Sequence, residues 1–410
     1  MSKWKKVKLG DLFSIKHGYA FSGEHIIEED NNVVLVTPGN FRIGGGFQER
    51  KCKFYDGEIP KDYILKEGDF IVTMTDLSKT IDTLGYSALV PKSDKRIYLH
   101  NQRIGLVQFK NDECDCEYIY WVMRTYDYQR AIANTSTGST VHHTSPSKIC
   151  DYECVVPDKA KQHRIATILS RYDTLIENYQ KQIKLLEEAA QRLYKEWFVD
   201  LRFPGYENVK MVDGLPEGWE RKKVKEIVNL QNGYAFKSTT FEDEGKYKVV
   251  TIKNVKDGVF DGDNVSCIKT IPEKMPSHCI LQTGDILLSL TGNVGRVCMV
   301  VGKDYLLNQR VAKLKSDYPA FVYCLFRNYD MFVAISNLAN GAAQQNVSPI
   351  RIGELMIMVA SGKTMMQFER MVGEIITKIL NLHSQNRLLT EARDRLLPRL
   401  MGGEFGRFNN

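Results

Sequence analysis

Hydrophobic and small residues recur at alternating intervals of four and three positions in the middle of the chain. The stretch from Lys161 to Phe198 contains no glycine or proline. The repeating positions are Ile165, Leu169, Tyr172, Ile176, Tyr179, Ile183, Leu186, Ala190, Leu193 and Trp197. This spacing is the seam of a heptad repeat, so it predicts one long helix that packs against another helix. Pro157 precedes the predicted helix and Pro204-Gly205 follows it, as expected of helix boundaries.

A less regular seam of the same kind lies near the end of the chain. Its positions are Phe368, Val372, Ile375, Ile379, Leu382, Asn386, Leu389, Arg393 and Leu396. Asn386 and Arg393 interrupt the apolar pattern, and a polar seam residue can select one register and one partner at some cost in stability. Two such helices favour antiparallel pairing within the molecule, with one globular domain at each end of a rod. A core helix in each half and a zipper between two chains are the alternatives.

Each predicted helix follows a globular region, and the two regions repeat each other. "HGYAF" at residues 17–21 and "NGYAF" at residues 232–236 lie 215 positions apart. Further matches follow in the same order, with small drifts in the offset. They pair Trp4 with Trp219, Lys8 with Lys223, Thr37 and Asn40 with Thr251 and Asn254, Gly68-Asp69 with Gly284-Asp285, Asn101-Gln102-Arg103 with Asn308-Gln309-Arg310, and Ser145-Pro146 with Ser348-Pro349. The chain is therefore predicted to contain a duplicated domain of about 200 residues, far longer than a solenoid repeat.

Short β-branched and apolar runs predict that each copy is mostly β. The runs are Val33–Thr37, Phe70–Thr75 and Tyr86–Val90 in the first copy, and Val249–Ile252, Ile286–Leu290 and Val297–Val301 in the second. Near the end of each copy, Tyr118–Asn134 and Phe321–Asn337 are each predicted to form a helix. The predicted fold is α+β: two similar, mostly β domains separated by two long helices that pair as an antiparallel coiled coil, with internal pseudo-two-fold symmetry. The expected boundaries are 1–156, 157–203, 204–360 and 361–410.

The composition is that of an ordinary globular protein, with a net charge of +6. This mild excess of positive charge permits a nucleic-acid partner without requiring one. No run approaches the length of a membrane span, and the first residues lack the apolar centre of a secretory signal. The nine cysteines form no regular framework. We therefore expect a cytoplasmic protein with reduced thiols.

Three stretches carry a resemblance to a known family. "LPEGWERKKVKEIV" opens the second copy, the first helix ends in "LYKEWFVDLRFPG", and the chain closes with "LLPRLMGGEF". Over essentially its whole length the chain resembles the DNA-specificity subunit of type I restriction–modification systems. The resemblance implies two target recognition domains, each reading one half of a bipartite, asymmetric site in double-stranded DNA. It implies that the helices act as a spacer and as the docking platform for two methyltransferase subunits. Those subunits would use S-adenosylmethionine to methylate adenine at N6, and motor-nuclease subunits would complete the enzyme.

One segment departs from the family pattern. The first copy has "TMTDLSKTIDTLGYSALV" where the second has the shorter "SLTGNVGRVCMV", and the family usually resembles the second form. We expect the extra residues to enlarge a loop, whose contact with DNA is left open.

The chain lacks the motifs of the chemistry that the family performs, so we expect it not to be an enzyme. The Pro-Pro pair of adenine methyltransferases is absent, and Gly44-Gly45-Gly46 has no dinucleotide-binding continuation. Ser361-Gly362-Lys363-Thr364 fails as a phosphate-binding loop because position 357 is an isoleucine. Cys114, Cys116, Cys150 and Cys154 do not have a strong zinc spacing. We expect no cofactor and no metal in this chain.

The loops that differ between the copies are the candidates for reading bases. The first loop carries Thr137, Ser139, Thr140, His142 and His143, and the second carries Gln344, Gln345 and Asn346. Glutamine and asparagine can hydrogen-bond adenine bidentately in the major groove. The alternative for both loops is a solvent-facing polar surface.

Residues that are identical in both copies suit a shared role better than base selection. Arg103 and Arg310 of the repeated "NQR" are candidates for phosphate contacts or for structural ion pairs. Within "GYAF", we expect the glycines Gly18 and Gly233 to supply a turn and the phenylalanines Phe21 and Phe236 to anchor it. Tyr19 and Tyr234 are candidates for DNA-backbone contacts, and Lys237 completes the DNA-binding set.

Apolar residues at the helix ends have two open interpretations. Trp197, Phe198, Leu396 and Leu397 either pack on the neighbouring domain or bind the methyltransferase. Two other functions remain alternatives for the whole chain: the specificity protein of a fused methyltransferase–nuclease outside type I, and a coiled-coil scaffold without a DNA role.

Overall fold

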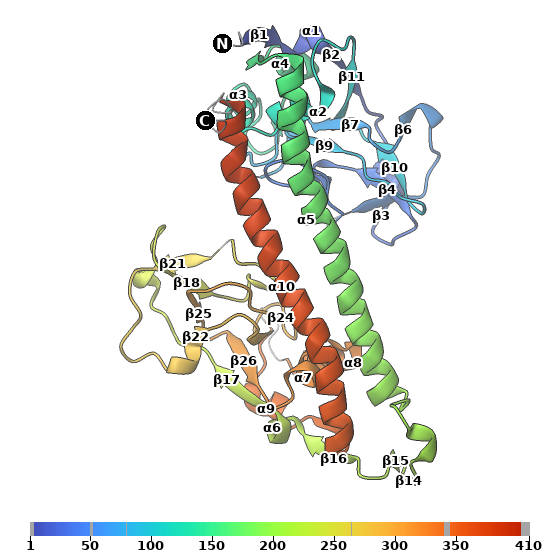
Figure 1. Cartoon of the computed structure of the whole chain (residues 1–410), viewed down its shortest axis with the longest axis vertical. Helices are drawn as coiled ribbons and strands as arrows, with labels where there is room; N and C mark the ends of the chain where they lie inside the picture. Colours follow the sequence, from blue (N-terminus) through green and yellow to red (C-terminus); the bar gives the residue numbers. More distant parts are fainter. Residues whose placement is uncertain (1–3, 50–51, 79, 264, 340–344, 403–410) are drawn as a thin grey trace. The chain divides into compact units, whose positions relative to one another are not determined.

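The structure is a computed structural model that describes residues 4–49, 52–78, 80–263, 265–339 and 345–402 (Figure 1). The chain divides into two compact units. Unit 1 comprises residues 1–174 and 390–410, and unit 2 comprises residues 175–389. Each unit contains one copy of the repeat together with a segment of both long helices.

Unit 1 is built around two sheets of short strands. The four-stranded sheet has the order β2 (Phe13–His17), β11 (Ile104–Phe109), β7 (Phe70–Thr73) and β9 (Ser87–Leu89). The five-stranded sheet has the order β3 (Ile26–Ile27), β5 (Lys53–Tyr55), β4 (Val33–Val36), β10 (Ile97–His100) and β6 (Ile64–Leu65). Two further pairs are β1 (Lys5–Lys8) with β13 (Glu153–Val156), and β8 (Thr75–Asp76) with β12 (His142–His143).

Unit 2 repeats this topology. Its four-stranded sheets have the orders β17 (Asn229–Asn232), β26 (Val311–Lys315), β23 (Ile286–Ser289), β24 (Val297–Met299), and β21 (Ser266–Ile268), β18 (Tyr247–Val250), β25 (Tyr305–Leu307), β22 (Ile280–Leu281). The pair β16 (Glu220–Lys223) with β27 (Met356–Val359) matches β1 with β13. Unit 2 adds the pairs β14 (Met211–Val212) with β15 (Leu215–Pro216), and β19 (Val255–Lys256) with β20 (Val259–Phe260).

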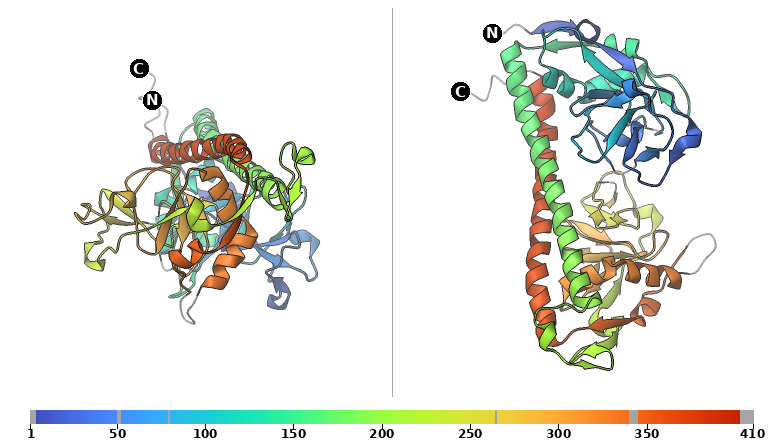
Figure 2. Two further views of the ribbon diagram at one scale, coloured as in Figure 1. Left: turned by 90° about the horizontal axis from the view of Figure 1, so that it is seen from below. Right: turned by 90° about the vertical axis from the view of Figure 1, so that its right-hand side faces the viewer.

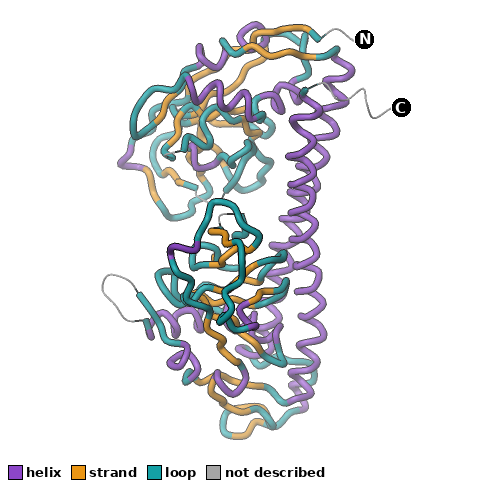
Figure 3. Tube along the Cα trace, turned by 90° about the vertical axis from the view of Figure 1, so that its left-hand side faces the viewer, coloured by secondary structure: helices purple, strands orange, loops and turns teal. Residues whose placement is uncertain are grey.

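The matching strands confirm the duplication, including its least common feature. In each unit one central pair is parallel, with Ile97 opposite Val33 in unit 1 and Tyr305 opposite Lys248 in unit 2. The other pairs of the main sheets are antiparallel, and long loops join the strands (Figure 3). The strands predicted from the sequence are present in both copies.

The short helices also occur in matching positions. They are α1 (Leu9–Leu12), α2 (Cys116–Val122), α3 (Tyr126–Asn134) and α4 (Pro146–Cys150) in unit 1, and α6 (Val224–Ile227), α7 (Pro319–Arg327), α8 (Tyr329–Leu338) and α9 (Pro349–Gly353) in unit 2.

The single helix predicted near the end of each copy is wrong, because two helices are present instead. Thr125 caps α3 by accepting a hydrogen bond from the Tyr128 backbone N–H at 3.3 Å. Asn328 caps α8 by accepting one from the Asp330 N–H at 2.9 Å. A capping side chain satisfies a free helix N–H and has non-helical backbone angles, so it starts a new helix where apolar spacing alone suggests a continuous one.

The two predicted long helices are confirmed as α5 (Lys159–Tyr194) and α10 (Gly362–Met401), which Figure 2 shows as unbroken helices. A π-helical turn, Lys195–Val199, continues α5. In unit 1, Asp173 of α5 is paired with Arg393 of α10 at 2.6 Å. In unit 2, the ring of Trp197 lies 5.5 Å from that of Phe368 near the start of α10. The end of the first long helix thus lies beside the start of α10, and an earlier part of α5 lies beside the end of α10, so the two helices run antiparallel.

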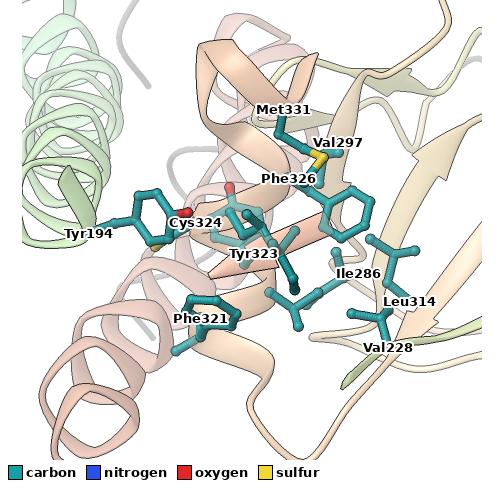
Figure 4. Close-up of a cluster of buried hydrophobic side chains, with 14 of the residues drawn as sticks. Tyr194, Val228, Ile286, Val297, Leu314, Phe321, Tyr323, Cys324, Phe326 and Met331 are labelled. Carbon is teal, nitrogen blue, oxygen red and sulfur yellow. The ribbon is translucent and has the colours of Figure 1, made fainter. Parts of the chain in front are cut away.

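The core of unit 2 extends from its sheets to both long helices. Phe321, Tyr323 and Phe326 of α7 lie among sheet residues such as Ile286 and Leu314 (Figure 4). In unit 1, Trp121 of α2 has no exposed surface and belongs to a core with Leu169 of α5 and Leu400 of α10. The heptad seam is thus part of the domain cores as well as of the helix pair. No helix in the described parts of the chain is both long enough and apolar enough to cross a membrane.

Candidate nucleic-acid interface

The two repeated motifs "GYAF" and "NQR" pack against each other in both units. The Tyr19 N–H donates to the His100 carbonyl at 2.8 Å, and the Gln102 N–H donates back to the Tyr19 carbonyl at 2.9 Å. Tyr234 makes the same two bonds with Leu307 and Gln309, each at 2.9 Å. Two matches that are far apart within each copy therefore form one structural element.

The glycine of "GYAF" is required by this close approach. A Cβ atom at Gly18 would lie 2.1 Å from the Asn101 carbonyl oxygen, and one at Gly233 would lie 2.2 Å from that of Asn308. Neither glycine is among the residues with positive φ. The turn expected from the sequence is therefore replaced by a contact between backbones, for which only glycine has room.

The aromatic residues of this element have separate positions. Phe21 is buried, whereas the Tyr19 side chain is 41% exposed, and their rings are 5.1 Å apart. Tyr234 and Phe236 repeat the edge-to-face contact at 5.1 Å. In unit 1 the phenylalanine thus anchors the segment on the core and the tyrosine remains accessible, whereas in unit 2 both rings are partly buried against the core.

Arg103 and Arg310 are exposed in equivalent positions. The Arg103 N–H donates to the Asn101 side chain at 3.0 Å, and the Arg310 N–H to the Asn308 side chain at 3.3 Å. Among the residues that the structure describes, no ion pair involves either guanidinium. The backbones of Arg103 and Arg310 are thus fixed by hydrogen bonds, while their charged guanidinium groups lie in solvent.

The differing loops occupy the same place beside these arginines. In unit 1 the Met74 N–H donates to the Arg103 carbonyl at 2.9 Å, and the Thr144 N–H donates to the Met74 carbonyl at 3.0 Å. In unit 2 Leu290, Arg310 and Val347 make the same two bonds, each at 3.0 Å. This register makes His143 equivalent to Asn346, and His142 equivalent to Gln345.

One threonine in each unit contacts the variable side chain. The Thr75 hydroxyl lies 3.2 Å from Nδ1 of His143, and the Thr291 hydroxyl donates to Oδ1 of Asn346 at 2.9 Å. His143 and Asn346 are nonetheless exposed. Gln344 lies outside the described residues. The predicted loops are therefore brought to matching positions that present different polar groups.

The remaining predicted contacts lie on the surface. Thr137, Ser139 and Thr140 are exposed, and Thr137 pairs with His143 through two backbone hydrogen bonds of 3.0 and 2.8 Å. Lys237 is exposed, and its carbonyl accepts a hydrogen bond from the Thr240 N–H at 3.0 Å.

The enlarged loop that follows β8 is organised by Asp76, which is only 2% exposed. Its carboxylate accepts hydrogen bonds from the N–H groups of Ser78 and Thr83, both at 2.6 Å, and from that of Leu84 at 3.1 Å. Burial alone would raise the pKa of the Asp76 carboxyl, but the bonds from Ser78 and Thr83 hold the pKa below its usual value.

Trp197 and Phe198 are enclosed by this chain. Their side chains are 3% and 2% exposed, and both rings contact Phe368. Both rings are thus packed within this chain and leave almost no surface exposed. Leu396 and Leu397 are half-buried against the core of unit 1.

Two arginines that sequence reasoning missed, the buried Arg124 and the partly buried Arg327, link α5 to the short helices of each unit. Arg124 is ion-paired with Asp173 of α5, and its Nη1 donates a hydrogen bond to the Tyr120 hydroxyl oxygen at 2.9 Å. Burial would raise the pKa of Asp173, but Arg124 and Arg393 hold that pKa below its usual value.

In unit 2, Arg327 donates to Glu187 of α5 and to the Tyr323 hydroxyl, both at 3.0 Å. Burial raises the pKa of Glu187 despite this partner. In the sequence, both arginines follow a tyrosine by four residues, and this repeated spacing could have identified them as a matching pair.

The cysteines in the described parts of the chain are free, and no group of three or more histidine, cysteine, aspartate or glutamate side chains there could hold a metal ion.

Comparison with known proteins agrees with the duplicated scaffold. The family described as "Type I restriction modification DNA specificity domain" matches residues 1–188 and again residues 216–393. The chain belongs to this family. Among curated relatives, the type I restriction enzyme MjaIX specificity subunit of Methanocaldococcus jannaschii is 28% identical over 70% of this chain and 68% of its own length. The HindI specificity subunit of Haemophilus influenzae is 23% identical over 98% of this chain and 100% of its own length.

A solved structure shares the fold of this family member. The type I restriction–modification S subunit of Mycoplasma genitalium is 17% identical and has a TM-score of 0.59 over 97% of this chain and 96% of its own. At that identity the likeness concerns the fold alone.

Proposed function

We propose that this chain is the non-catalytic specificity subunit of a type I restriction–modification complex, and that each unit reads one half of a bipartite, asymmetric DNA site. One observation carries the proposal. The two units present different side chains, His142-His143 and Gln345-Asn346, from equivalent backbone positions on a matching scaffold. Selection for two different half-sites requires this combination, because the scaffold must dock in the same way while the base-reading groups change.

The chemistry of the shared surface supports a division of labour. Arg103 and Arg310 have exposed guanidinium groups and equivalent backbone anchors. Phosphate contacts position a protein on DNA without reading sequence, so identical residues suit them. Base edges in the major groove present distinct donors and acceptors, which imidazole and amide groups can match.

The long helices suit the assembly role that the family implies. We propose that surfaces of α5 and α10 bind two adenine-N6 methyltransferase subunits, through which motor-nuclease subunits join. S-adenosylmethionine would be bound by the methyltransferases. Exposed apolar side chains on these helices, such as Leu185 (65% exposed) and Met366 (69%), are accessible for that contact, whereas Trp197 and Phe198 are not.

The test is to produce the chain with its methyltransferase partner and to sequence the methylated adenines of the host genome. We expect one interrupted motif with two unlike halves. Replacing His142 and His143 by alanine should relax one half of the motif, and replacing Gln345 and Asn346 should relax the other. If both pairs changed the same half, independent reading by the two units would be excluded. If no sequence-specific methylation depended on this chain, the proposed function would fall.

A further inference from the structure

The two units differ in how the chain runs from β7 to β9 in unit 1 and from β23 to β24 in unit 2. Thr73 and Ser289 occupy equivalent positions, and each side chain donates to the carbonyl two residues ahead, Thr75 or Thr291. Gly85 and Gly295 then return to this point, since their N–H groups donate to the carbonyls of Thr73 and Ser289 at 2.9 and 3.0 Å. The frame around the two segments is therefore the same.

Within this frame, Asp76 takes the place of Gly292. Two residues separate Gly292 from Gly295, whereas eight separate Asp76 from Gly85. Unit 2 closes the segment with glycines of positive φ, +70° at Gly292 and +81° at Gly295. The scaffold consequently needs neither the extra residues nor the aspartate in order to close.

The longer loop of unit 1 nevertheless contains a buried carboxylate, that of Asp76. Besides its three backbone bonds, the Asp76 carboxylate accepts the Thr83 hydroxyl at 2.8 Å. The loop has further internal bonds, from the Asp82 N–H to Ser78 at 3.0 Å and from Thr80 to the Asp82 carboxylate at 2.6 Å. The Gln129 side chain of α3 also donates to the Ile81 carbonyl at 2.6 Å. These bonds hold the described residues of the loop, 76–78 and 80–84, in place, because leaving a buried carboxylate without its donors is unfavourable.

The ordered loop lies beside the candidate base-reading strand. Asp76 is directly opposite His142 in the antiparallel pair of β8 with β12. The next residue, Leu77, is 60% exposed, and Thr80 is also exposed. With this exposure, the Leu77 side chain has no role in the core of unit 1. Aliphatic groups contact the thymine methyl in the major groove or insert as wedges between base steps, and hydroxyls can hydrogen-bond base edges.

We infer that the loop after β8 is a second base-reading element of unit 1, with Leu77 as its DNA contact and Asp76 as the positioning residue that holds it beside His142. The inference rests on the proposed function and deepens it. Unit 1 would read its half-site with two adjacent elements, whereas unit 2 has only a short turn at the equivalent place.

The experiment uses the complete chain assembled with its methyltransferase and a DNA library randomised in each half-site in turn. Leu77→Ala is expected to relax discrimination at one or two positions of the half-site read by unit 1, on the order of tenfold. Asp76→Asn places an amide group against the N–H donors of the loop, so it should relax the same positions. Selectivity for the other half-site should be unchanged in both variants.

Two further variants separate positioning from stability. Asp69 also accepts a backbone hydrogen bond, from the Lys66 N–H at 2.8 Å in a turn of unit 1, so Asp69→Asn is the matched control and should retain the wild-type profile. Replacing residues 76–85 by the "GNVG" of unit 2 should leave the fold intact and abolish the same discrimination.

The outcomes distinguish this inference from the proposed function. A wild-type complex without any selectivity would overturn the proposed function. A selective wild type whose Leu77→Ala and loop-replacement variants keep the full profile would overturn the inference alone. A loss of Tm in Asp76→Asn with no change in either profile would likewise make Asp76 a structural residue only.

Discussion

The "GYAF"–"NQR" element and the loop beside it lie next to each other in each unit, yet they differ in how far the two copies agree. The first has the same residues and nearly the same hydrogen bonds in both copies, as at Tyr19 and Tyr234. The loop region presents two histidines and an extended loop in unit 1, but an amide-bearing segment and a glycine turn in unit 2. The difference indicates that a duplicated domain can keep its docking scaffold while it changes what the scaffold presents.

Arg124 and Arg327 provide a second comparison, and the buried Arg124 gives the largest expected effect. Asp173→Ala would leave Arg124, whose side chain is 3% exposed, without its carboxylate, and would also release Arg393. Breaking a buried ion pair from one side costs about 3–5 kcal/mol. We expect a loss of that order in the free energy of unfolding, measured by denaturant titration.

The matched control is Glu188→Ala, because Glu188 is 61% exposed and lies 4.0 Å from Lys184 on the same helix. Such surface pairs contribute roughly 0.5 kcal/mol or less. Equal losses for the two variants would mean that the buried pair does not anchor unit 1.

The "GYAF"–"NQR" element should be most sensitive to substitution at its glycine, which is Gly18 in unit 1. Gly18→Ala places a Cβ atom 2.1 Å from the Asn101 carbonyl oxygen, so the two backbones must separate. We expect a loss of about 2–3 kcal/mol, seen as a lower Tm by circular dichroism. A Cβ atom at Gly23 meets nothing within 4 Å, so Gly23→Ala should leave Tm nearly unchanged. A tolerated Gly18→Ala would show that the close approach is not a constraint.

The stability of unit 1 should depend on pH through Asp76, whereas unit 2 has Gly292 at the equivalent position. Its pKa is lowered, so it contributes stability above the unfolded-state pKa of about 3.9 and loses it as pH falls through the folded value. The Tm difference between wild type and Asp76→Asn should be largest near neutral pH and should close below about pH 4. A difference that grows on acidification, in calorimetric scans across this range, would contradict the assignment.

The exposed arginines should affect affinity without affecting selectivity. Arg103→Ala is expected to weaken DNA binding about equally for all sequences and to reduce the slope of log affinity against log salt by about 0.9, the value for one phosphate contact. Fluorescence anisotropy at several salt concentrations measures both effects. Lys184→Ala removes an exposed charge from α5 and is the control for net charge alone. A sequence-dependent loss would instead assign Arg103 to base reading.

The smallest effect is expected in the helix seam. Oδ1 of Asn386 is buried and has no hydrogen-bond partner in the described part of the chain. Asn386→Leu should therefore raise the free energy of unfolding by about 1 kcal/mol, because it removes an unsatisfied polar group. Calorimetry of the full chain tests this expectation, and a destabilised variant would show that the asparagine is satisfied by water.

Several features follow from the sequence alone, because they depend on local periodicity or on internal comparison. The seam from Ile165 to Trp197 identifies a helix that must pack on another helix, whatever the rest of the chain does. The alternation of short β-branched runs identifies the strands, and the ordered matches identify the duplication. The same comparison directs attention to His142-His143 and Gln345-Asn346, because they differ where their surroundings agree.

Tertiary structure alone decides the contacts between distant segments. From the sequence, Gly18 is predicted to form a turn, but the structure places the Asn101 carbonyl where a Cβ atom of residue 18 would lie. From the sequence, Asp76 is an ordinary loop residue, but in the structure its carboxylate accepts hydrogen bonds from the N–H groups of Thr83 and Leu84. Trp197 and Phe198 lie at the end of the first long helix, where the sequence does not show what covers them. In the structure both rings contact Phe368, which is 170 positions after Phe198. Periodicity reports which face of an element is apolar. It does not report which distant backbone or side chain meets that face, because such contacts are selected by the packing of the whole core.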